Sequence, residues 1–326
     1  MSTAAIAGCG VVGRKRALAL SELGVSVGAV FDIDRSRAES LAKELGQGST
    51  VASDAQAAFS SGDVDLAVVA SNHASLAELA LTAIDHGCHV VVEKPGATRV
   101  ADLEAVAKAG AKANRIVRVG FNHRFHPSII KARQLIADGQ AGDIMHIRAR
   151  YGHGGRVGYE NEWRANAELS GGGEMLDQGI HLIDLTRYFA GNVDLAFAEL
   201  RTDFWNTDVE DNVFFALHSD SGAFAWLHAS WTEWKNMFSM EIALERAKIE
   251  ITGLGGSYGV EGLIIYRMLP EMGPPVTEAF QWPGEDDSWR LENADVLAHI
   301  AGEGYNGSTV DDGLAALSIV EEAYRR

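Results

Sequence analysis

Short apolar runs alternate with amphipathic segments over about the first 120 residues of the chain. Runs such as Leu66-Ala67-Val68-Val69-Ala70 show no polar alternation, as expected for a strand that is covered on both faces. This order of elements predicts a parallel sheet wrapped by helices. The predicted strands are Ala4–Gly8, Ser26–Phe31, Leu66–Ala70, His89–Val92 and Ile116–Gly120, and the predicted helices are Val12–Leu23, Ser36–Leu45, Leu76–His86 and Val100–Ala113.

The pattern changes after Gly120. Several strands follow from Val193 to about Arg267, with turn signals such as Asp220-Ser221-Gly222 between them. Runs of strands that follow a region of alternating strands and helices indicate a separate domain with an antiparallel or mixed sheet. The other elements predicted here are a helix over Pro127–Asp138, a strand over Asp143–Tyr151, a Gly-rich loop that leads into a helix carrying Asp177, and a closing helix over Ser308–Arg326.

The sequence Gly8-Cys9-Gly10-Val11-Val12-Gly13 stands directly after a predicted strand and directly before a predicted helix. In this context the first glycine of G-x-G-x-x-G allows a tight turn, the second lets the backbone approach a pyrophosphate, and the third lets helix and strand pack closely. The N–H groups and the positive end of the helix dipole attract phosphates. The motif therefore predicts a dinucleotide site, with a plain glycine turn as the alternative.

Asp32 ends the second predicted strand, at about the distance from the glycines that ribose recognition requires. A carboxylate there accepts hydrogen bonds from the ribose 2′-hydroxyl and repels a 2′-phosphate, which favours NAD over NADP. Arg35 and Arg37 could reach a 2′-phosphate from the next helical turn, so NADP is the alternative cofactor. Solvation of the helix surface is the preferred interpretation of these two arginines, and NAD is therefore the leading cofactor.

Lys94 follows the apolar strand Val90-Val91-Val92, within the sequence Glu93-Lys94-Pro95. Ligands of open α/β sheets bind at the carboxyl ends of the strands, so we expect Lys94 to lie beside the substrate. Its ammonium group can hydrogen-bond a hydroxyl that becomes a carbonyl and stabilise negative charge on that oxygen. A surface lysine after a strand is the alternative interpretation.

The segment Gly171–Asp184 contains a glycine run that leads into a predicted helix with Asp177 and His181. Residues four apart lie on the same face of an α-helix. The pair suits proton transfer, because an imidazole titrates near neutral pH and a carboxylate can orient it. A histidine with a purely structural role in the core is the alternative.

The composition limits the class of protein. A formal net charge of −17 argues against nucleic acid or an anionic membrane as the main partner. Cys9 and Cys88, the two cysteines, fit a reducing cytoplasm and lack the paired spacing of a zinc site. Met1-Ser2-Thr3 leads into an apolar strand without the basic region of an export signal, and no apolar run approaches the length of a membrane span. We therefore expect a soluble cytoplasmic protein that acts on a small molecule.

Five motifs together resemble the Gfo/Idh/MocA oxidoreductases, and the resemblance runs nearly end to end. The motifs are Gly8–Gly13, Glu93-Lys94-Pro95, Asn122-His123-Arg124-Phe125-His126-Pro127, Trp163-Arg164 and Gly171–Asp184, followed by the tail at residues 307–314. The resemblance implies an α/β fold with a Rossmann dinucleotide-binding domain over residues 1–121. It implies an α+β domain with an open, mainly antiparallel sheet over residues 122–326, for substrate binding and assembly into a homodimer or homotetramer.

The resemblance also implies a reaction. Members mostly oxidise or reduce a hydroxyl of a sugar, a cyclitol or a nucleotide-linked sugar with a nicotinamide cofactor. His181 would remove the hydroxyl proton, Lys94 would polarise the oxygen, and Asp177 would orient His181 or hold a neighbouring hydroxyl. The expected cofactor-binding residues are Gly8, Gly10, Val11, Val12, Gly13, Asp32, Ile33, Ser71, Asn72, Glu93, Lys94 and Asn122. The expected substrate-binding residues are Arg124, Tyr151, His153, Arg156, Trp163 and Arg164.

Several positions leave alternatives open. Many members have a histidine where this chain has Leu76, and the nearby His73 has a different offset, which leaves cofactor contacts from residues 71–76 open. The spacing His123-x-x-His126 could suggest a metal, but the family pattern needs none and we expect none. Trp163 could instead be a core aromatic and Arg156 a loop charge. Convergence of several arginines would favour an anionic or nucleotide-linked sugar.

Three classes of function fit these features. An NAD(P)-dependent dehydrogenase or reductase is the leading hypothesis. A glycoside hydrolase that retains its NAD and oxidises its substrate transiently is the second. A non-catalytic dinucleotide-binding regulator is the third, and the intact Lys94, Asp177 and His181 argue against it.

Overall fold

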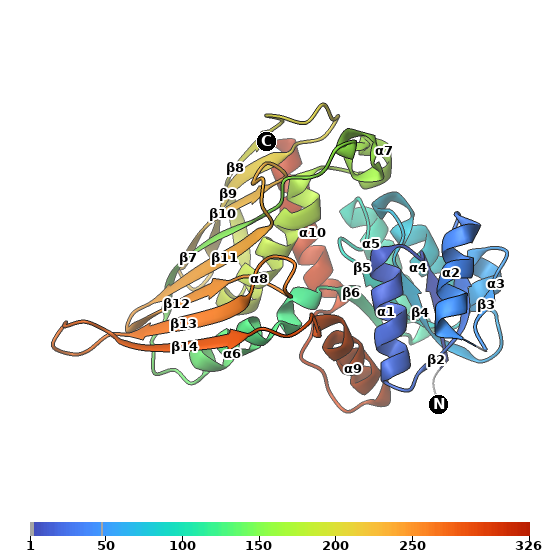
Figure 1. Ribbon diagram of the computed structural model, residues 1–326, viewed down its shortest axis with the longest axis horizontal. Helices are drawn as coiled ribbons and strands as arrows, with labels where there is room; N and C mark the ends of the chain where they lie inside the picture. Colours follow the sequence, from blue (N-terminus) through green and yellow to red (C-terminus); the bar gives the residue numbers. More distant parts are fainter. Residues whose placement is uncertain (1–2, 47) are drawn as a thin grey trace. The chain divides into compact units, whose positions relative to one another are not determined.

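The structure is a computed structural model that describes residues 3–46 and 48–326. Met1 and Ser2, which contribute to the expectation about an export signal, lie outside the described residues. The chain forms two compact units (Figure 1). The first contains residues 1–122, 168–171 and 289–317, and the second contains residues 123–167, 172–288 and 318–326. No helix of the described residues combines the length and the apolar character needed to cross a membrane.

The first unit is built on a six-stranded parallel sheet with the order β3-β2-β1-β4-β5-β6. Its strands are β1 (Thr3–Ala7), β2 (Ser26–Phe31), β3 (Thr50–Val51), β4 (Val64–Val69), β5 (His89–Glu93) and β6 (Val117–Gly120). The strand order reverses between β1 and β4, and such a switch point is where open α/β sheets bind ligands at the carboxyl ends of their strands. The parallel sheet confirms the prediction for this part of the chain.

Helices connect the strands of this sheet, as Figure 1 shows for the blue and cyan part of the chain. They are α1 (Val11–Glu22), α2 (Arg35–Leu45), α3 (Ala55–Phe59), α4 (Leu76–Asp85) and α5 (Val100–Ala113). The strands Val64–Val69 and His89–Glu93 are almost entirely buried, because helices cover both faces of a parallel sheet. The core between the sheet, α1 and α2 includes Ile6, Leu20 and Leu41.

The second unit contains an eight-stranded mixed sheet with the order β14-β13-β12-β11-β7-β10-β9-β8. Every neighbouring pair is antiparallel except β7 and β10, which are parallel. The strands are β7 (Ile144–Gly152), β8 (Val193–Arg201), β9 (Asn212–Ser219), β10 (Phe224–Ser230), β11 (Met237–Leu244), β12 (Ala247–Thr252), β13 (Glu261–Arg267) and β14 (Val276–Trp282). The expected mainly antiparallel sheet is confirmed.

Helices α6 (Pro127–Ala137) and α8 (Ile180–Ala190) pack on one face of this sheet. Along β10, buried residues such as Ala225 and Leu227 alternate with exposed Phe224 and Trp226. This period of two means that one face of the sheet is covered and the other is open to solvent. Most of helix α7 (Ala167–Ser170) belongs to the first unit, and the closing helix α10 (Val310–Arg325) begins in the first unit and ends in the second.

The structure differs from the predictions in four places. The sequence gives no signal for the two-residue strand β3, the five-residue helix α3 or the helix α9 (Ser288–Ala301). Helix α9 lacks a simple apolar face, because it buries Glu292 and Asn293 together with Val296. The segment Met175–Gly179 is a π-helical turn rather than the α-helix that was predicted there. An apolar pattern does not distinguish such a turn, which typically occurs within α-helices and often at functional sites.

Candidate active site

The glycine-rich turn of the first unit is shaped by close backbone packing. Gly8 has a φ of +97°, and a Cβ atom on it would lie 2.4 Å from the Ala70 carbonyl oxygen. A Cβ atom on Gly13 would lie 1.8 Å from the carbonyl oxygen of Gly8. A Cβ atom on Gly10, in contrast, would meet no heavy atom of a described residue within 4 Å. The fold itself therefore requires Gly8 and Gly13, whereas Gly10 faces open space.

The start of α1 is suited to an anionic ligand. Gly10 is the residue before the helix, and no side chain of a described residue caps its first turn. The first turn contains no acidic residue. Val11, the first residue of the helix, is exposed, as is Ile33 after β2. Backbone N–H groups at an uncapped helix start, next to the open space at Gly10, fit the pyrophosphate of a dinucleotide.

Asp32 joins the end of β2 to the glycine-rich turn. One carboxylate oxygen accepts a hydrogen bond from the Cys9 N–H at 2.7 Å, and the other accepts one from the Asp34 N–H at 2.8 Å. These two bonds fix the orientation of the carboxylate. Arg35 pairs with Glu39 and Arg37 pairs with Asp34, both on the surface of α2. The arginines therefore have carboxylate partners of their own.

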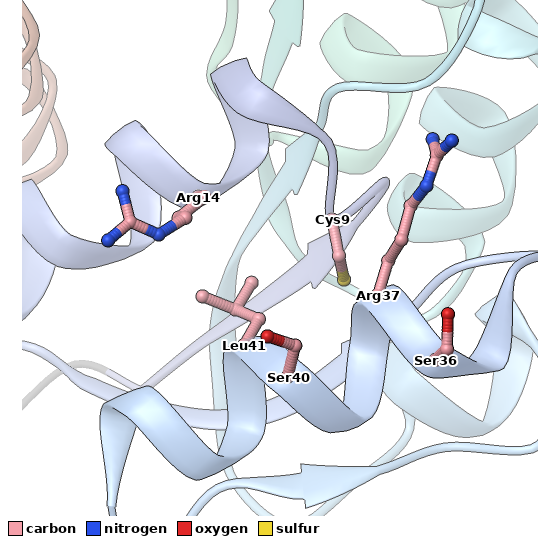
Figure 2. A pocket seen from close by; sticks show the side chains of 6 residues that line it. All are labelled: Cys9, Arg14, Ser36, Arg37, Ser40 and Leu41. Atoms are coloured by element: carbon pink, nitrogen blue, oxygen red, sulfur yellow. The ribbon is translucent and has the colours of Figure 1, made fainter.

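A hollow of about 240 Å³ lies beside this turn, between α1 and α2. Figure 2 shows Cys9 from the glycine-rich turn, Arg14 from α1 and four residues of α2 around it. Burial, together with the nearby Asp32 carboxylate, raises the pKa of the Cys9 thiol to about 12. Cys9 is therefore a neutral thiol at physiological pH, and it packs against the turn as a small apolar side chain. The residues that line the hollow are Cys9, Arg14, Ser36, Arg37, Ser40 and Leu41.

The residues after β4 form a local hydrogen-bond network. The Ser75 hydroxyl lies 2.9 Å from the Ser71 hydroxyl and 3.0 Å from the Asn72 side-chain oxygen. His73 is buried, and its Nδ1 lies 2.9 Å from the Ser170 carbonyl oxygen within the same unit. Leu76 is fully buried. Ser71 and Asn72, two of the expected cofactor residues, thus stand at the carboxyl end of β4 in a defined conformation.

Glu93 and Lys94 stand at the carboxyl end of β5. Glu93 is buried and forms an ion pair with the fully buried Arg16 of α1. The same guanidinium binds Glu292 of α9 at 2.7 Å. Burial raises the pKa of Glu292, and the charge of Arg16 opposes that effect. Lys94 is partly exposed, and its peptide bond to Pro95 is cis. Asn122, the last expected cofactor residue, is buried after β6.

Sequence reasoning missed Arg16 and Glu292. Arg16 stands one helical turn from the buried Leu20, on the face of α1 where only apolar residues are expected. That position is the one local signal of a buried arginine. Glu292 lies 276 residues further along the chain, so no spacing rule connects it to Arg16.

In the second unit a buried carboxylate anchors the segment that bears Asp177. The Glu210 side chain accepts hydrogen bonds from the Gly173 N–H at 3.1 Å, the Met175 N–H at 3.0 Å and the Tyr324 hydroxyl at 2.8 Å. A Cβ atom on Gly173 would lie 2.0 Å from the Glu210 carbonyl oxygen. Burial raises the pKa of Glu210, and the three hydrogen bonds partly offset that effect. No local pattern in the sequence predicts a role for Glu210 or Tyr324.

Asp177 and His181 are both buried, at 7% and 5% exposure. Arg164 forms an ion pair with Asp177, with 3.2 Å between Nε and Oδ2, and its guanidinium stacks on the Trp163 ring at 4.4 Å. The ring of His181 stacks on that of His123, with centroids 3.8 Å apart. The Tyr151 hydroxyl lies 3.1 Å from Nε2 of His123. The structure thus brings a carboxylate, an imidazole and their partners together in one buried cluster of this unit.

The expected substrate-binding residues have different environments. Tyr151 belongs to the buried cluster, and burial raises its pKa well above the ordinary value, so its phenol is neutral. His153 accepts a hydrogen bond from the Gly155 N–H at 2.9 Å, and burial lowers its pKa. Trp163 is half-buried. Arg156 is exposed and pairs with Glu162 at 2.8 Å.

Arg124, another of the expected substrate-binding residues, forms an ion pair inside the second unit. Its guanidinium is buried and makes hydrogen bonds of 2.6 and 2.9 Å to the fully buried carboxylate of Asp184 in α8. It also packs on the Tyr188 ring. A buried bidentate pair of this kind fixes two segments relative to each other. The structure therefore gives Arg124 a role in joining these two segments, and the contact with substrate that the sequence suggests for it stays a prediction.

The fold and these residues define a two-domain dinucleotide-dependent oxidoreductase. Residues 3–121 match the model of the GFO/IDH/MocA oxidoreductase family, described as an NAD-binding Rossmann fold. Residues 129–258 match the C-terminal domain model of the same family. The chain belongs to the GFO/IDH/MocA family, and its N-terminal unit is an NAD-binding domain, as expected from the motifs.

Relatives of known name support this assignment. Inositol 2-dehydrogenase 2 of Saccharopolyspora erythraea is 28% identical over 97% of this chain and 90% of its own length. D-glucoside 3-dehydrogenase of Escherichia coli is 30% identical over 62% of each chain. A levoglucosan dehydrogenase in complex with NADH and levoglucosan has the same fold, with a TM-score of 0.85, 21% identity and coverage of 99% of this chain and 97% of that one.

Proposed function

We propose that the protein oxidises a secondary hydroxyl of a neutral sugar or cyclitol with NAD, and reduces the ketone in the reverse direction. The observation that carries the proposal is the buried pair of Asp177 and His181 in a chain whose other unit is an NAD-binding domain. The named relatives act on an inositol, a glucoside and levoglucosan, all of them polyhydroxylated rings. Membership of one family supports transfer of that substrate class to this chain.

Each catalytic side chain has a distinct task in this proposal. NAD, when bound, supplies the acceptor for the hydride. His181 accepts the hydroxyl proton as the carbon–oxygen double bond forms. Lys94 donates a hydrogen bond to the same oxygen and stabilises the negative charge that develops on it. Asp177, which is held by Arg164, orients the imidazole or binds a neighbouring hydroxyl.

The charge balance of the second unit favours an uncharged substrate. Arg124 pairs with Asp184, Arg156 with Glu162 and Arg164 with Asp177. Each candidate arginine thus has a carboxylate partner, whereas recognition of a phosphate needs guanidinium groups whose charge is not already balanced. We therefore prefer a neutral sugar or cyclitol to a nucleotide-linked sugar. Tyr151, His153, Trp163 and Arg164 are the side chains that we assign to substrate binding.

Asp32 supports NAD as the preferred cofactor. Its carboxylate is held in place by two backbone N–H groups, and it would lie against the negative charge of a 2′-phosphate. Arg35 and Arg37 are paired with acidic side chains on the helix surface. NADP would therefore bind more weakly than NAD.

The open face of the second unit's sheet supports a homo-oligomer. Phe197 and Trp226 stack on this face with nearly parallel rings, and both are exposed. Exposed aromatic residues on a flat sheet are typical of a surface that is covered by a second copy. We propose a homodimer or homotetramer formed through this face. The two free, buried thiols of Cys9 and Cys88 support a cytoplasmic location.

The test is absorbance of reduced nicotinamide at its near-ultraviolet band, with NAD or NADP and a panel of polyols. The panel contains inositols, aldoses, methyl glucosides, levoglucosan and nucleotide-linked sugars. We expect NAD reduction with a neutral ring, loss of turnover in His181→Ala and Lys94→Ala, and wild-type turnover in His86→Gln. His86 follows α4 at the amino ends of the strands, away from the glycine-rich turn.

Other outcomes would contradict the proposal. Sugar release without net formation of NADH would identify a hydrolase that retains its cofactor. Cofactor binding without turnover of any panel member would indicate a regulator.

A further inference from the structure

The imidazole rings of His123 and His181 form a stacked pair in the buried cluster of the second unit. Their centroids are 3.8 Å apart and their planes are inclined by 24°. Both residues are buried, at 7% and 5% exposure. His123 has no part in the catalytic roles described above.

Two independent contacts hold the pair together. The Tyr151 hydroxyl lies 3.1 Å from Nε2 of His123 and fixes the plane of its ring. The ion pair of Arg124 and Asp184 joins the same two segments, since Arg124 follows His123 and Asp184 lies one helical turn after His181. The stack is therefore a defined feature of the fold, built from the turn at residues 122–125 and the start of α8.

Two imidazolium ions at this distance would repel each other strongly, because the buried environment screens their charges poorly. Groups that interact this closely bind their protons in two steps that belong to the pair. The first proton binds to one ring and lowers the affinity of the other ring for a second proton. The order in which the rings are protonated decides what the pair does for catalysis.

The surroundings favour His123 as the ring that is protonated first. Tyr151 is a neutral phenol, and its oxygen can accept a hydrogen bond from Nε2–H of a charged His123. The carboxylate nearest in sequence to His181, that of Asp177, is already balanced by Arg164. On the other side of His123, the His126 ring pairs with Glu261 at 3.0 Å. Other titratable groups near the cluster include Glu174, His153, Tyr159 and Tyr258, the last of which packs on Tyr151.

We propose that His123 is a positioning residue of this reaction: its stacked ring fixes the plane of His181 and takes up the first proton, so that His181 stays neutral and able to accept the hydroxyl proton as the pH falls. The proposal rests on the proposed dehydrogenase function for its effect on turnover. The shared protonation of the two rings can be measured without any substrate.

In the first test, NMR monitors a pH titration of the whole protein after histidine-selective ¹⁵N labelling. The His181 signal is assigned by its absence from His181→Gln. In His123→Gln the amide can still bond to Tyr151 but takes up no proton, and His123→Phe keeps a stacked ring as a second variant. We expect the midpoint of the His181 titration to rise by about one pH unit or more in both variants, and to stay unchanged in His86→Gln. An unchanged His181 midpoint in the variants would overturn the proposal.

The second test uses the pH profile of kcat/KM for alcohol oxidation. Loss of the competing charge makes His181 easier to protonate, so the acid limb of the profile moves to higher pH. On that limb the variants should lose about tenfold in kcat/KM for each pH unit of displacement. A purely structural role would lower kcat/KM at every pH and leave the limb where it is, which would contradict the proposal. If no substrate is turned over at all, the NMR result still decides whether the rings share a proton.

Discussion

Both units contain a glycine run that leads into a helix, and the two runs use their backbone N–H groups differently. In the first unit the N–H groups at the start of α1 have no capping side chain among the described residues, and Gly10 faces open space. In the second unit the Glu210 carboxylate of the protein itself binds the N–H groups of Gly173 and Met175. The glycine run of the first unit is suited to binding an anionic ligand, whereas that of the second unit binds a carboxylate of the protein itself. A glycine-rich helix start alone therefore does not identify a phosphate site.

The greatest loss of activity is expected on replacement of His181, which follows the segment that Glu210 holds in place. Replacement of the proton acceptor in His181→Ala should lower kcat by about 10²–10⁴. The affinity for NADH, measured by the quenching of protein fluorescence, should stay within twofold of the wild type. A variant with normal kcat would remove His181 from the mechanism.

Removal of the buried Glu210 carboxylate should have the next largest effect, and this effect is on the free energy of unfolding. Glu210→Ala leaves two backbone N–H groups and the Tyr324 hydroxyl without their acceptor, each at a cost of about 1–3 kcal/mol if they stay buried. We expect the free energy of unfolding in urea to fall by about 3 kcal/mol. Glu104→Ala, which removes an exposed partner of Lys108, should change it by less than about 1 kcal/mol. Equal effects of the two variants would show that Glu210 anchors nothing.

The glycines of the first unit provide a matched pair. Gly13→Ala places a Cβ atom 1.8 Å from the Gly8 carbonyl oxygen and should lower the melting temperature and weaken NAD binding together. Gly10→Ala meets no heavy atom of a described residue, so the melting temperature should stay the same while NAD binding weakens by about tenfold or more. Calorimetry of both variants with and without NADH separates the two effects. Unchanged binding in Gly10→Ala would mean that the pyrophosphate does not approach this turn.

Loss of the hydrogen bond from Tyr324 to the Glu210 carboxylate should change the free energy of unfolding least, by an amount that depends on pH. Burial raises the pKa of Glu210, and the Tyr324 hydroxyl opposes that shift. Because the folded state holds the proton more tightly than the unfolded state, stability falls as the pH rises through the folded pKa. Tyr324→Phe removes a donor to the ionised carboxylate, so its loss of about 1–2 kcal/mol should appear near neutral pH and shrink in acid. Urea unfolding at several pH values measures it, and a constant deficit would contradict this assignment.

The sequence predicts those parts of the site that lie close together in the chain. The glycine-rich turn, Lys94 after its strand, and the neighbours Asp177 and His181 all follow from local patterns. The parallel sheet was predictable for the same reason, since uninterrupted apolar strands alternate with amphipathic helices.

The sequence does not predict contacts between distant segments. Arg16 and Glu292 are 276 residues apart, and Glu210 and Tyr324 are 114 apart. The pair of Arg124 with Asp184 was not predictable for the same reason, because Asp184 lies 60 residues further along the chain. A charge pattern does not show which carboxylate will be buried beside which guanidinium. The stack of His123 on His181 also arises only when two turns meet in the folded unit.

Direct oxidation of a CH–OH group by this protein can be tested by following the hydride itself. A substrate found in the polyol panel would be prepared with deuterium on the carbon that bears the reactive hydroxyl, and the nicotinamide product analysed by mass spectrometry. We expect one deuterium in each NADH formed, with a matching amount of ketone. NADH without deuterium, or product formed without NADH, would contradict direct oxidation of a CH–OH group by this protein.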